Sequence, residues 1–361
     1  MPFPATFGSQ VYVGHLCAAL VRSGVRVHLA CYSGSGEGPE GVTLVRARKV
    51  PGGGFTRSGP HWSRLAQDAL LARAVSKVPG LDIVHGHNVE GPLVARLARV
   101  SCPVVYGQHT AMAEELQQWF PFRGVRHVGR LVDAVVPAVS DASIALSHGG
   151  VETLSGMTAV SPPGVRLADL EGAEPQRARL RYGLDSRPWV VYAGNTDPYQ
   201  DLDRLFEAMT LVPLAGLLVV TGNDPEPWSA LGRRLGLGAE RLRVVGGAGF
   251  SDMKDALAAS TVAVCPRRLC RGFPIKLLNQ LGLGVPTVCA PGSARPIDGV
   301  VVAADDTVEG LAAAIQDLVH DPARRERLST LARADIVNRW SWDSRALDVI
   351  RVYERVLRRG R

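Results

Sequence analysis

Short apolar runs rich in β-branched residues alternate with amphipathic stretches along nearly the whole chain. Several runs are apolar at consecutive positions, which is typical of parallel strands buried on both faces. Stretches with helical spacing lie between them, so the repeated order of strand, crossover and strand predicts a doubly wound α/β architecture. The predicted strands are residues 25–31, 42–46, 83–85, 104–106, 134–139, 189–193, 217–221, 242–245, 262–265, 287–289 and 300–302. The predicted helices are residues 10–23, 62–78, 91–100, 171–184, 199–209, 253–259, 274–283, 308–319 and 343–358.

A domain boundary is expected at Ser161-Pro162-Pro163-Gly164, where a rigid and then flexible segment interrupts the pattern. It divides the chain into two Rossmann-like domains, residues 1–164 and residues 165–341. The last helix has its apolar residues on one face and needs a hydrophobic surface to lie on. We therefore expect residues 342–361 to complete the first domain.

The beginning of the chain differs from that of a normal doubly wound domain. Such a domain opens with a buried strand that leads into a glycine turn, but here the turn comes at once, within residues 2–8. Pro2 and Pro4 cannot lie in the interior of a central strand. We expect the first strand to be missing, residues 1–6 to form a loop, and one position of the first sheet to be vacant or distorted.

Composition narrows the class of protein. The 361 residues are 46% hydrophobic and 21% charged, which excludes a disordered or fibrous protein. No stretch reaches the length of about 18 apolar residues that a membrane-spanning helix needs, and no secretory leader is recognised. Six scattered cysteines without a Cys-x-x-Cys pair favour reduced thiols in a cytoplasmic protein over a disulfide framework or a zinc site. The net charge of +7 suits phosphates, but the motifs of nucleic-acid-binding proteins are missing, so nucleic acid is not expected as a partner.

Two histidines stand at the ends of predicted strands, where the ligand crevice of an open α/β sheet lies. His87 follows residues 83–85 and His109 follows residues 104–106. Gly8 and Ser9 precede an amphipathic helix, whose free N–H groups either bind a phosphate or simply start the helix. The chain has neither a Gly-x-x-x-x-Gly-Lys-Ser/Thr loop nor a Gly-x-Gly-x-x-Gly turn after a strand, which argues against nucleotide hydrolases and dehydrogenases.

The most informative stretch, residues 265–288, reads as strand, basic loop, helix, glycine turn and strand. Arg267, Arg268, Arg271 and Lys276 crowd the loop and the first helical turn, where the helix dipole already favours an anion. A solvated basic face is the simpler interpretation, but it does not explain why these charges follow the carboxyl end of a strand. The pattern favours an anion site.

This stretch resembles the C-terminal signature of the family 4 retaining glycosyltransferases, which have the GT-B fold. The signature is Glu-Gly-Phe-Gly-x-x-x-x-Glu-Ala-x-Ala-x-Gly-x-Pro-Val-Val, and Gly272, Phe273, Gly284 and Pro286 fall in register with it. The resemblance extends over nearly the whole chain. It includes the N-terminal glycine loop, the two histidine segments, the interdomain segment 161–165 and the crossover at Trp340-Ser341-Trp342. It implies two Rossmann-like domains that face each other across a cleft.

Two parts of the family pattern differ here. The two acidic positions, eight residues apart, are Arg271 and Asn279. In the family the second carboxylate binds the ribose hydroxyls of the nucleotide, and Asn279 can form hydrogen bonds there without charge. The usual Gly-Arg…Glu-Lys-Gly pair, which neutralises the donor diphosphate, appears as residues 194–201 with neither cation. A diphosphate leaving group needs positive charge, so either Arg267, Arg271 and Lys276 supply it or the protein is not catalytic.

Asp201-Leu202-Asp203 resembles the metal-binding Asp-x-Asp of a different glycosyltransferase fold. It falls in a predicted first helical turn, where acidic residues are favoured by the helix dipole. We therefore expect a structural role for this motif, and neither a metal nor another cofactor.

The resemblance implies a glycosyltransferase that moves a sugar from a nucleotide-diphosphate sugar to a glycan, lipid or small-molecule acceptor with retention, as in cell envelope polysaccharide synthesis. Two alternatives stay open: a catalytically degenerate binding or regulatory module of the same fold, and a sugar-nucleotide epimerase. The catalytic candidates are His109, Lys276 and Arg271. The substrate-binding candidates are Gly8, Ser9, His87, Gly194, Asn195, Gln200, Gly222, Arg267, Gly272, Phe273 and Asn279.

Residues 122–130 mix apolar and basic side chains, and relatives dock on anionic lipid through this domain. A basic patch contributes about 1 kcal/mol per charge near such a surface. A solvated basic loop and a peripheral contact with the inner face of the membrane are equally compatible with the sequence.

Overall fold

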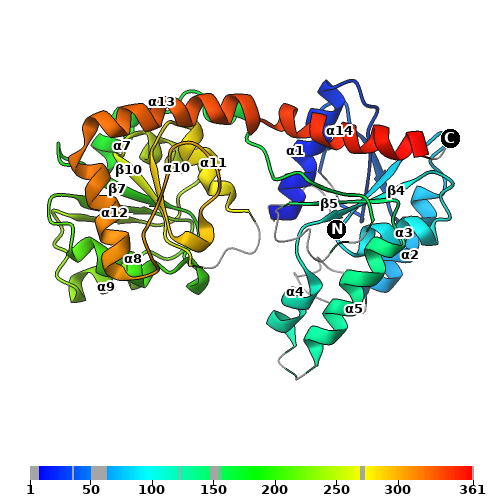
Figure 1. Cartoon of the computed structure of the whole chain (residues 1–361), viewed down its shortest axis with the longest axis horizontal. Helices are drawn as coiled ribbons and strands as arrows, with labels where there is room; N and C mark the ends of the chain where they lie inside the picture. Colours follow the sequence, from blue (N-terminus) through cyan, green and yellow to red (C-terminus); the bar gives the residue numbers. More distant parts are fainter. Residues whose placement is uncertain are drawn as a thin grey trace. The chain divides into compact units, whose positions relative to one another are not determined.

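The computed structural model describes residues 8–34, 36–49, 63–120, 122, 124–146, 154, 156–268 and 273–359. The chain forms two compact units, which are coloured by sequence in Figure 1. The first unit comprises Met1–Pro163, the short segment Arg271–Phe273 and Trp342–Arg361. The second unit contains most of the chain between them, Gly164–Cys270 and Pro274–Ser341.

The second unit is built on one six-stranded sheet in which every pair of neighbours is parallel. Its strand order is β12-β11-β10-β7-β8-β9. The strands are β7 (Trp189–Ala193), β8 (Gly216–Val220), β9 (Leu242–Val245), β10 (Val262–Cys265), β11 (Thr287–Cys289) and β12 (Val300–Val302). Every residue of β7, β8, β10 and β11 is buried, which explains their continuous apolar sequence.

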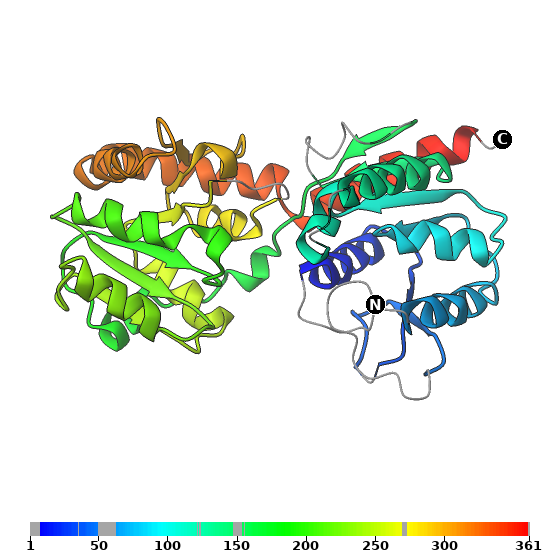
Figure 2. The same cartoon turned by 90° about the horizontal axis from the view of Figure 1, so that it is seen from below.

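Helices cover both faces of this sheet, as Figures 1 and 2 show. The helices are α7 (Pro175–Tyr182), α8 (Leu202–Thr210), α9 (Glu226–Arg234), α10 (Phe250–Ala258), α11 (Ile275–Gly282), α12 (Val308–His320) and α13 (Pro322–Arg339). Short 3₁₀ turns are η1 (Leu167–Asp169), η2 (Pro198–Gln200) and η3 (Pro291–Ser293). One core joins α8, α9 and α12 to the sheet, and a second core joins α7 and α10 to its other face. The sheet is therefore the middle layer of a three-layer unit.

The described strands of the first unit form two parallel sheets. One pairs β1 (His28–Cys31) with β2 (Thr43–Arg46). The other has the order β3-β4-β5-β6 and consists of β3 (Val84–His87), β4 (Val104–Gln108), β5 (Ala142–Ala145) and β6 (Thr158–Val160). Within the described ranges no ladder joins these two sheets, and the vacant or distorted position expected in the first sheet stays a prediction. The loop predicted for residues 1–6 lies outside the described residues.

The described helices of this unit are α1 (Gly8–Arg22), α2 (Ser63–Val75), α3 (Glu90–Leu97), α4 (Met112–Trp119), α5 (Val125–Ala138) and α14 (Trp342–Arg359). The final helix packs with α1 over one face of the four-stranded sheet, where Tyr12, Leu16, Val349 and Val352 share a core with Val105. The helices α2 and α3 share a separate core with Tyr32 at the end of β1. The amphipathic face of the last helix thus finds the surface that its sequence requires.

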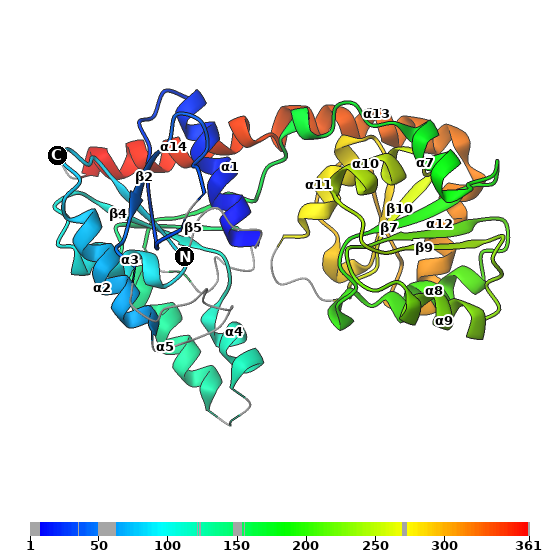
Figure 3. The same ribbon diagram turned by 180° about the vertical axis from the view of Figure 1, so that it is seen from behind.

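The strand predicted at residues 134–139 is wrong, because this segment is the last part of α5. Its apolar residues do not all point inward: Val136 is 1% exposed, whereas Val135 is 45% exposed. The cause lies one turn earlier. Gly129 has no side chain, so α5 approaches the backbone of Ala113 in α4 so closely that a Cβ atom would lie 2.4 Å from its Cα. Figure 3 shows these two helices side by side.

A buried carboxylate fixes the same helix pair. Asp133 of α5 accepts hydrogen bonds from the backbone N–H groups of Met112 and Ala113, at 2.8 and 2.9 Å. These groups open α4 and would otherwise be unpaired, so Asp133 acts as a cap supplied by a neighbouring helix. The segment 122–130 is therefore not simply a loop, because its described part from Val125 onward is the beginning of α5.

Candidate functional site

The order of the second sheet reverses at its centre, between β7 and β10. Strands after β7 are added on one side of it, and strands after β10 on the other. The loops that leave the carboxyl ends of β7 and β10 diverge there, and ligands of open α/β sheets bind at such a point. The loop after β7 begins with Gly194 and Asn195, and the loop after β10 begins with Pro266 and Arg267. Segments that are distant in sequence thereby bring several predicted residues together at this edge of the sheet.

Lys276 lies in the first turn of α11 and its ammonium group is held at this point. Its Nζ atom donates to the hydroxyl of Tyr192 and to Oε1 of Gln200, both at 2.8 Å. It also lies 4.3 Å from the centre of the Tyr192 ring, a cation–π contact. A Cβ atom at Gly194, whose φ is +146°, would lie 3.2 Å from Nζ. The glycine therefore allows both the turn and the close approach of the cation.

The loop after β7 orients these partners. Gln200 is 4% exposed and donates through Nε2 to Oδ1 of Asn195 at 2.8 Å. The Tyr192 hydroxyl donates to the backbone carbonyl of Asn195. Burial raises the pKa of Tyr192, so the phenol stays neutral. Each polar group is thus fixed by another, and the ammonium of Lys276 is the charge that they position.

A second cation lies nearby on the loop after β10. The guanidinium carbon of Arg267 lies 4.6 Å from the centre of the Tyr199 ring, and Tyr199 also accepts a hydrogen bond from Nδ2 of Asn195 at 3.0 Å. The side chain of Arg268 is 59% exposed and pairs with Asp201. The Nε–Oδ2 distance of this ion pair is 2.8 Å.

The structure also describes the predicted residues Gly222, Asn279 and Phe273. Gly222 follows β8, and the neighbouring Asn223 accepts the backbone N–H of Thr196 at 3.1 Å, which ties the loops after β7 and β8 together. Asn279 is half-buried, one helical turn after Lys276, and its side chain has no hydrogen bond to the described part of the chain. Phe273 is also half-buried. Arg271 and Gly272 lie outside the described residues.

Asp201 and Asp203 lie in different surroundings. Asp201 has a left-handed backbone, φ +59°, and its carboxylate pairs with Arg204 and Arg268. Asp203 lies in the first turn of α8. Among the described residues, no group of three or more histidine, cysteine or acidic side chains could hold a metal ion.

In the first unit, the two predicted histidines are in contact. Nδ1 of His87 lies 3.1 Å from Nε2 of His109, so one ring donates a hydrogen bond to the other. A third histidine, His85, stacks at 4.2 Å from His87 and shares a hydrogen bond of 2.8 Å with the Tyr353 hydroxyl of α14. A Cβ atom at Gly107 would lie 2.7 Å from Nδ1 of His87, so only glycine leaves room for the cluster.

Burial keeps these three imidazoles neutral at physiological pH. It lowers the pKa of His85 to about 3 and that of His109 to about 4, and the pKa of His87 falls well below its usual value. A neutral ring can accept a proton or a hydrogen bond from a hydroxyl group.

At the start of α1, Gly8 and Ser9 lie in a first turn without acidic residues, so no carboxylate there repels an anion.

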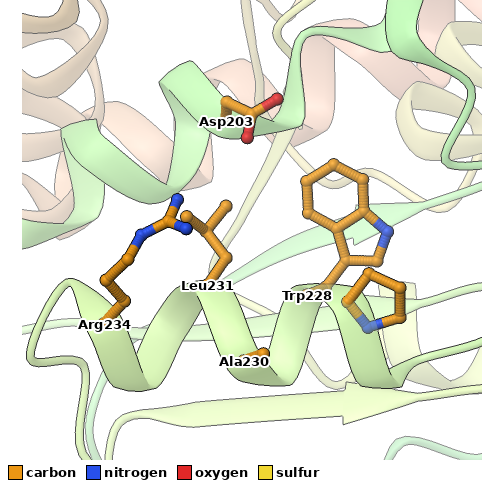
Figure 4. A pocket seen from close by; sticks show the side chains of 6 residues that line it. Asp203, Trp228, Ala230, Leu231 and Arg234 are labelled. Atoms are coloured by element: carbon orange, nitrogen blue, oxygen red, sulfur yellow. The ribbon is translucent and has the colours of Figure 1, made fainter.

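A separate cavity of about 270 Å³ lies between α8 and α9, and Figure 4 shows its lining. Trp228 forms one wall and packs on the core residue Phe206 with ring centres 5.7 Å apart. Asp203 and Arg234 stand at the rim. The cavity contains none of the predicted site residues.

Sequence reasoning missed four residues of these two sites: Tyr192, Asn223, His85 and Arg204. A tyrosine within the otherwise apolar run 189–193 was a usable signal, because a buried hydroxyl needs a partner. The alternation of His85 and His87 on one strand face was another. The contacts of Asn223 and Arg204 depend on loops that only the fold brings together.

Two family models match this chain. The model described as Glycosyltransferase Family 4 matches residues 8–164, and the model described as Glycosyl transferases group 1 matches residues 187–321. The D-inositol 3-phosphate glycosyltransferase of Jonesia denitrificans is 25% identical, over 96% of this chain and 91% of that protein. A GDP-mannose-dependent alpha-(1-6)-phosphatidylinositol monomannoside mannosyltransferase of Mycolicibacterium smegmatis is 29% identical, over 51% of this chain and 53% of that protein.

Solved structures share the fold. The sucrose-phosphate synthase of Thermosynechococcus elongatus has a TM-score of 0.79 at 19% identity, covering 98% of this chain and 94% of its own. Anabaena HepE, solved in complex with UDP and glucose, has a TM-score of 0.72 at 15% identity and covers 98% of both chains. Two Rossmann-like units, both family models and these GT-B neighbours agree. The chain belongs to family 4 of the GT-B glycosyltransferases, the glycosyl transferases of group 1.

Proposed function

We propose that this glycosyltransferase takes a nucleotide-diphosphate sugar as donor and binds its diphosphate beside Lys276. The observation that carries the proposal is the fixed ammonium at the point where the second sheet reverses. Arg267 adds a second positive charge on the adjacent loop. Positive charge placed in advance stabilises the diphosphate as it leaves, without reorganisation during the reaction.

Lys276 replaces a cation that the family carries in another place. The family pattern has a lysine where this chain has Gln200, and here Oε1 of Gln200 lies 2.8 Å from the Lys276 ammonium. A lysine at position 200 would therefore bring its own ammonium close to the same point. The charge is supplied from α11 instead of from the loop after β7.

An exchange of the two side chains tests this proposal. Lys276→Gln should lower kcat/KM for the donor by about one to two decades, the usual loss for a charge-assisted bond to phosphate. Gln200→Lys alone should also lower it, because two ammonium groups would then compete for one position. The double variant Gln200→Lys/Lys276→Gln should regain most of the activity.

Lys254→Gln is the matched control, because Lys254 donates to the carbonyl of Glu171 on the exposed surface of α10. Activity is measured as nucleotide released from a panel of UDP and GDP sugars. Retention is checked by NMR of the anomeric proton of the product. Full activity of Lys276→Gln would place the phosphates elsewhere.

The neutral residues Asn195, Gln200 and Asn279 favour one alternative, a binding module of this fold without transfer. Such a module would bind UDP or GDP, as a titration shows, but release no nucleotide from any donor. A sugar-nucleotide epimerase would instead convert one sugar nucleotide into another without an acceptor. Separation of the products by anion-exchange chromatography distinguishes the three outcomes.

For the acceptor we propose a hydroxylated glycan or lipid-linked molecule that binds near His87 and His109. The named relatives act on inositol 3-phosphate and on a phosphatidylinositol mannoside, which makes inositol phosphates and phosphoinositides the first acceptors to try. A neutral imidazole suits the hydrogen bond that such a hydroxyl donates. His109→Phe should remove transfer while leaving donor binding unchanged, and loss of both would indicate a structural effect.

A peripheral contact with anionic membrane is proposed for the α4–α5 hairpin. Phe122, Val128 and Leu131 are 57%, 50% and 64% exposed, and Arg126 and Arg130 are exposed on the same helix. Within the described ranges, no helix is both long and apolar enough to cross a bilayer. Sedimentation with phosphatidylglycerol vesicles should show salt-sensitive binding that Leu131→Glu weakens. Equal recovery with neutral vesicles would contradict the proposal.

A further inference from the structure

We propose that Arg204 is a positioning residue for donor binding, an inference that rests on the proposed function. Arg204 lies in the first turn of α8 and is only 6% exposed. Among the described residues, its guanidinium has no hydrogen bond or ion pair with a predicted ligand-binding side chain. It contacts three different loops at the carboxyl edge of the second sheet instead.

The three contacts fasten these loops to one another. Nε of Arg204 donates to Oδ2 of Asp201 at 2.7 Å, in the loop after β7. An Nη2 proton is donated to the carbonyl of Pro266, in the loop after β10. Nη1 lies 3.9 Å from Oδ1 of Asp306, in the segment between β12 and α12. The planar guanidinium can satisfy several directions at once, which an ammonium cannot.

The loop after β10 is thereby held on both sides of Arg267. Arg204 binds the carbonyl that precedes Arg267, and Asp201 pairs with Arg268, which follows it. Asp201 serves both arginines through one carboxylate, from a left-handed backbone position that few residues other than glycine adopt. The arrangement places the Arg267 guanidinium over Tyr199, next to the Lys276 centre.

A half-buried arginine at the opposite edge of the sheet gives the matched control. Arg241 precedes β9 and donates to the carbonyls of Ala215, Met209 and Val212 at 3.2, 2.9 and 2.7 Å. It therefore also binds several carbonyl groups of the second unit, but at the amino edge of the same sheet. Arg204→Lys and Arg241→Lys should lower the melting temperature alike.

Two measurements separate positioning from stability. Arg204→Lys should speed trypsin cleavage after Arg267 and Arg268, followed by mass spectrometry, whereas Arg241→Lys should not. Arg204→Lys should also raise the dissociation constants of UDP and GDP and the donor KM by about tenfold, the effect of one charge-assisted hydrogen bond. Arg241→Lys should leave these constants unchanged, and in Arg204→Lys kcat should change less than KM.

Each result decides a different point. Unchanged cleavage and unchanged affinity in Arg204→Lys would overturn the inference. Faster cleavage with unchanged affinity would show a loop clamp that has no role in donor binding, and would overturn it as well. If the wild-type protein binds neither nucleotide and transfers no sugar, the proposed function fails, whereas the cleavage rates still test the clamp. Should Arg204→Lys not fold, Asp201→Asn removes the charge that pairs with Arg204 and Arg268 but keeps the bond from Arg204 to the Pro266 carbonyl, and the same measurements should change in the same directions.

Discussion

The two units have the same kind of α/β architecture but place their candidate site residues differently. The second unit has a single six-stranded sheet whose central strands are wholly apolar and buried. Its candidate site lies in the loops at the carboxyl edge, where Lys276 and Arg204 are fixed by several partners. The candidate site of this unit therefore lies at the edge of the sheet and outside the apolar strands.

The first unit places titratable groups inside its core. Eight of the nine histidines of the chain belong to it, since only His320 lies in the second unit. His85, His87 and His109 meet between the sheet and the helices α1 and α14, next to Tyr12 and Tyr353. The same kind of fold can therefore hold a candidate site at the edge of a sheet, as in the second unit, or within the packed core, as in the first unit. The two units should respond differently to acid and to substitution.

The largest expected difference is the response to acid. Because the folded pKa values of the three histidines are lowered, the unfolded chain takes up protons first as the pH falls below about 6.5. Their stabilising effect is present at neutral pH and is lost towards pH 4. Each histidine that titrates only in the unfolded chain costs about 1.4 kcal/mol per pH unit. The first unit should therefore unfold at a lower temperature at pH 5 than at pH 7.

Scanning calorimetry at the two pH values measures this difference, and peptide-resolved hydrogen exchange assigns the transitions to the units. His85→Gln removes one of the three titrating histidines, so the stability of the first unit should fall less steeply between pH 7 and pH 5. The second unit serves as the internal control. Equal acid sensitivity of both units would contradict the predicted difference between them.

A smaller effect is expected from adding one methyl group at matched glycines in helices. Gly129→Ala in the first unit places Cβ against the backbone of Ala113, which cannot move without parting α4 from α5. We expect a loss of about 1–3 kcal/mol of stability in that unit. In Gly232→Ala, in α9, the new Cβ atom meets the flexible end of the Leu242 side chain instead. The gain in helix propensity of about 1 kcal/mol should offset the cost of this contact, so the stability of the second unit should change little.

Urea denaturation of both variants, again resolved by unit, measures the two effects. The second variant is the control for the general effect of an alanine in a helix. Equal stability of the two variants would mean that the α4–α5 contact is softer than the packing suggests.

The same contrast explains how far the sequence predicted the fold. All six strands of the second unit were predicted to within a residue, since a continuous apolar run buried on both faces leaves little choice. In the first unit the run 134–139 carries the same signal but ends a helix, because Gly129 and Asp133 attach α5 to α4. Such tertiary contacts leave no local pattern, and β5, β6 and α4 were missed beside it.

The candidate site shows a similar limit. Strand ends and basic residues predicted His87, His109, Arg267 and Lys276, because the topology of a parallel sheet brings the carboxyl ends of its strands to one edge. The pairing of these groups with their partners was not predictable. Tyr192 lies 84 positions before Lys276, and only the order of the strands brings them together.

The smallest effect that we predict concerns Asn279. Its amide lies on α11 one turn after Lys276, and it has no hydrogen bond within the described part of the chain, so a ligand can use it. If it binds the ribose of the donor, Asn279→Ala should weaken binding of UDP or GDP by about threefold to tenfold, the value of one neutral hydrogen bond. Its effect is smaller than that of Lys276→Gln because no charge is involved.

A nucleotide analogue makes this last prediction specific to the ribose. The wild-type protein should bind the 2′,3′-dideoxy diphosphate more weakly than the normal nucleotide, whereas Asn279→Ala should bind both alike. The two losses would then not add, as expected of groups in direct contact. Additive losses in a calorimetric titration would mean that Asn279 acts away from the ribose. In that case the second unit holds its nucleotide through the phosphates and the base, with Lys276 as the main anchor.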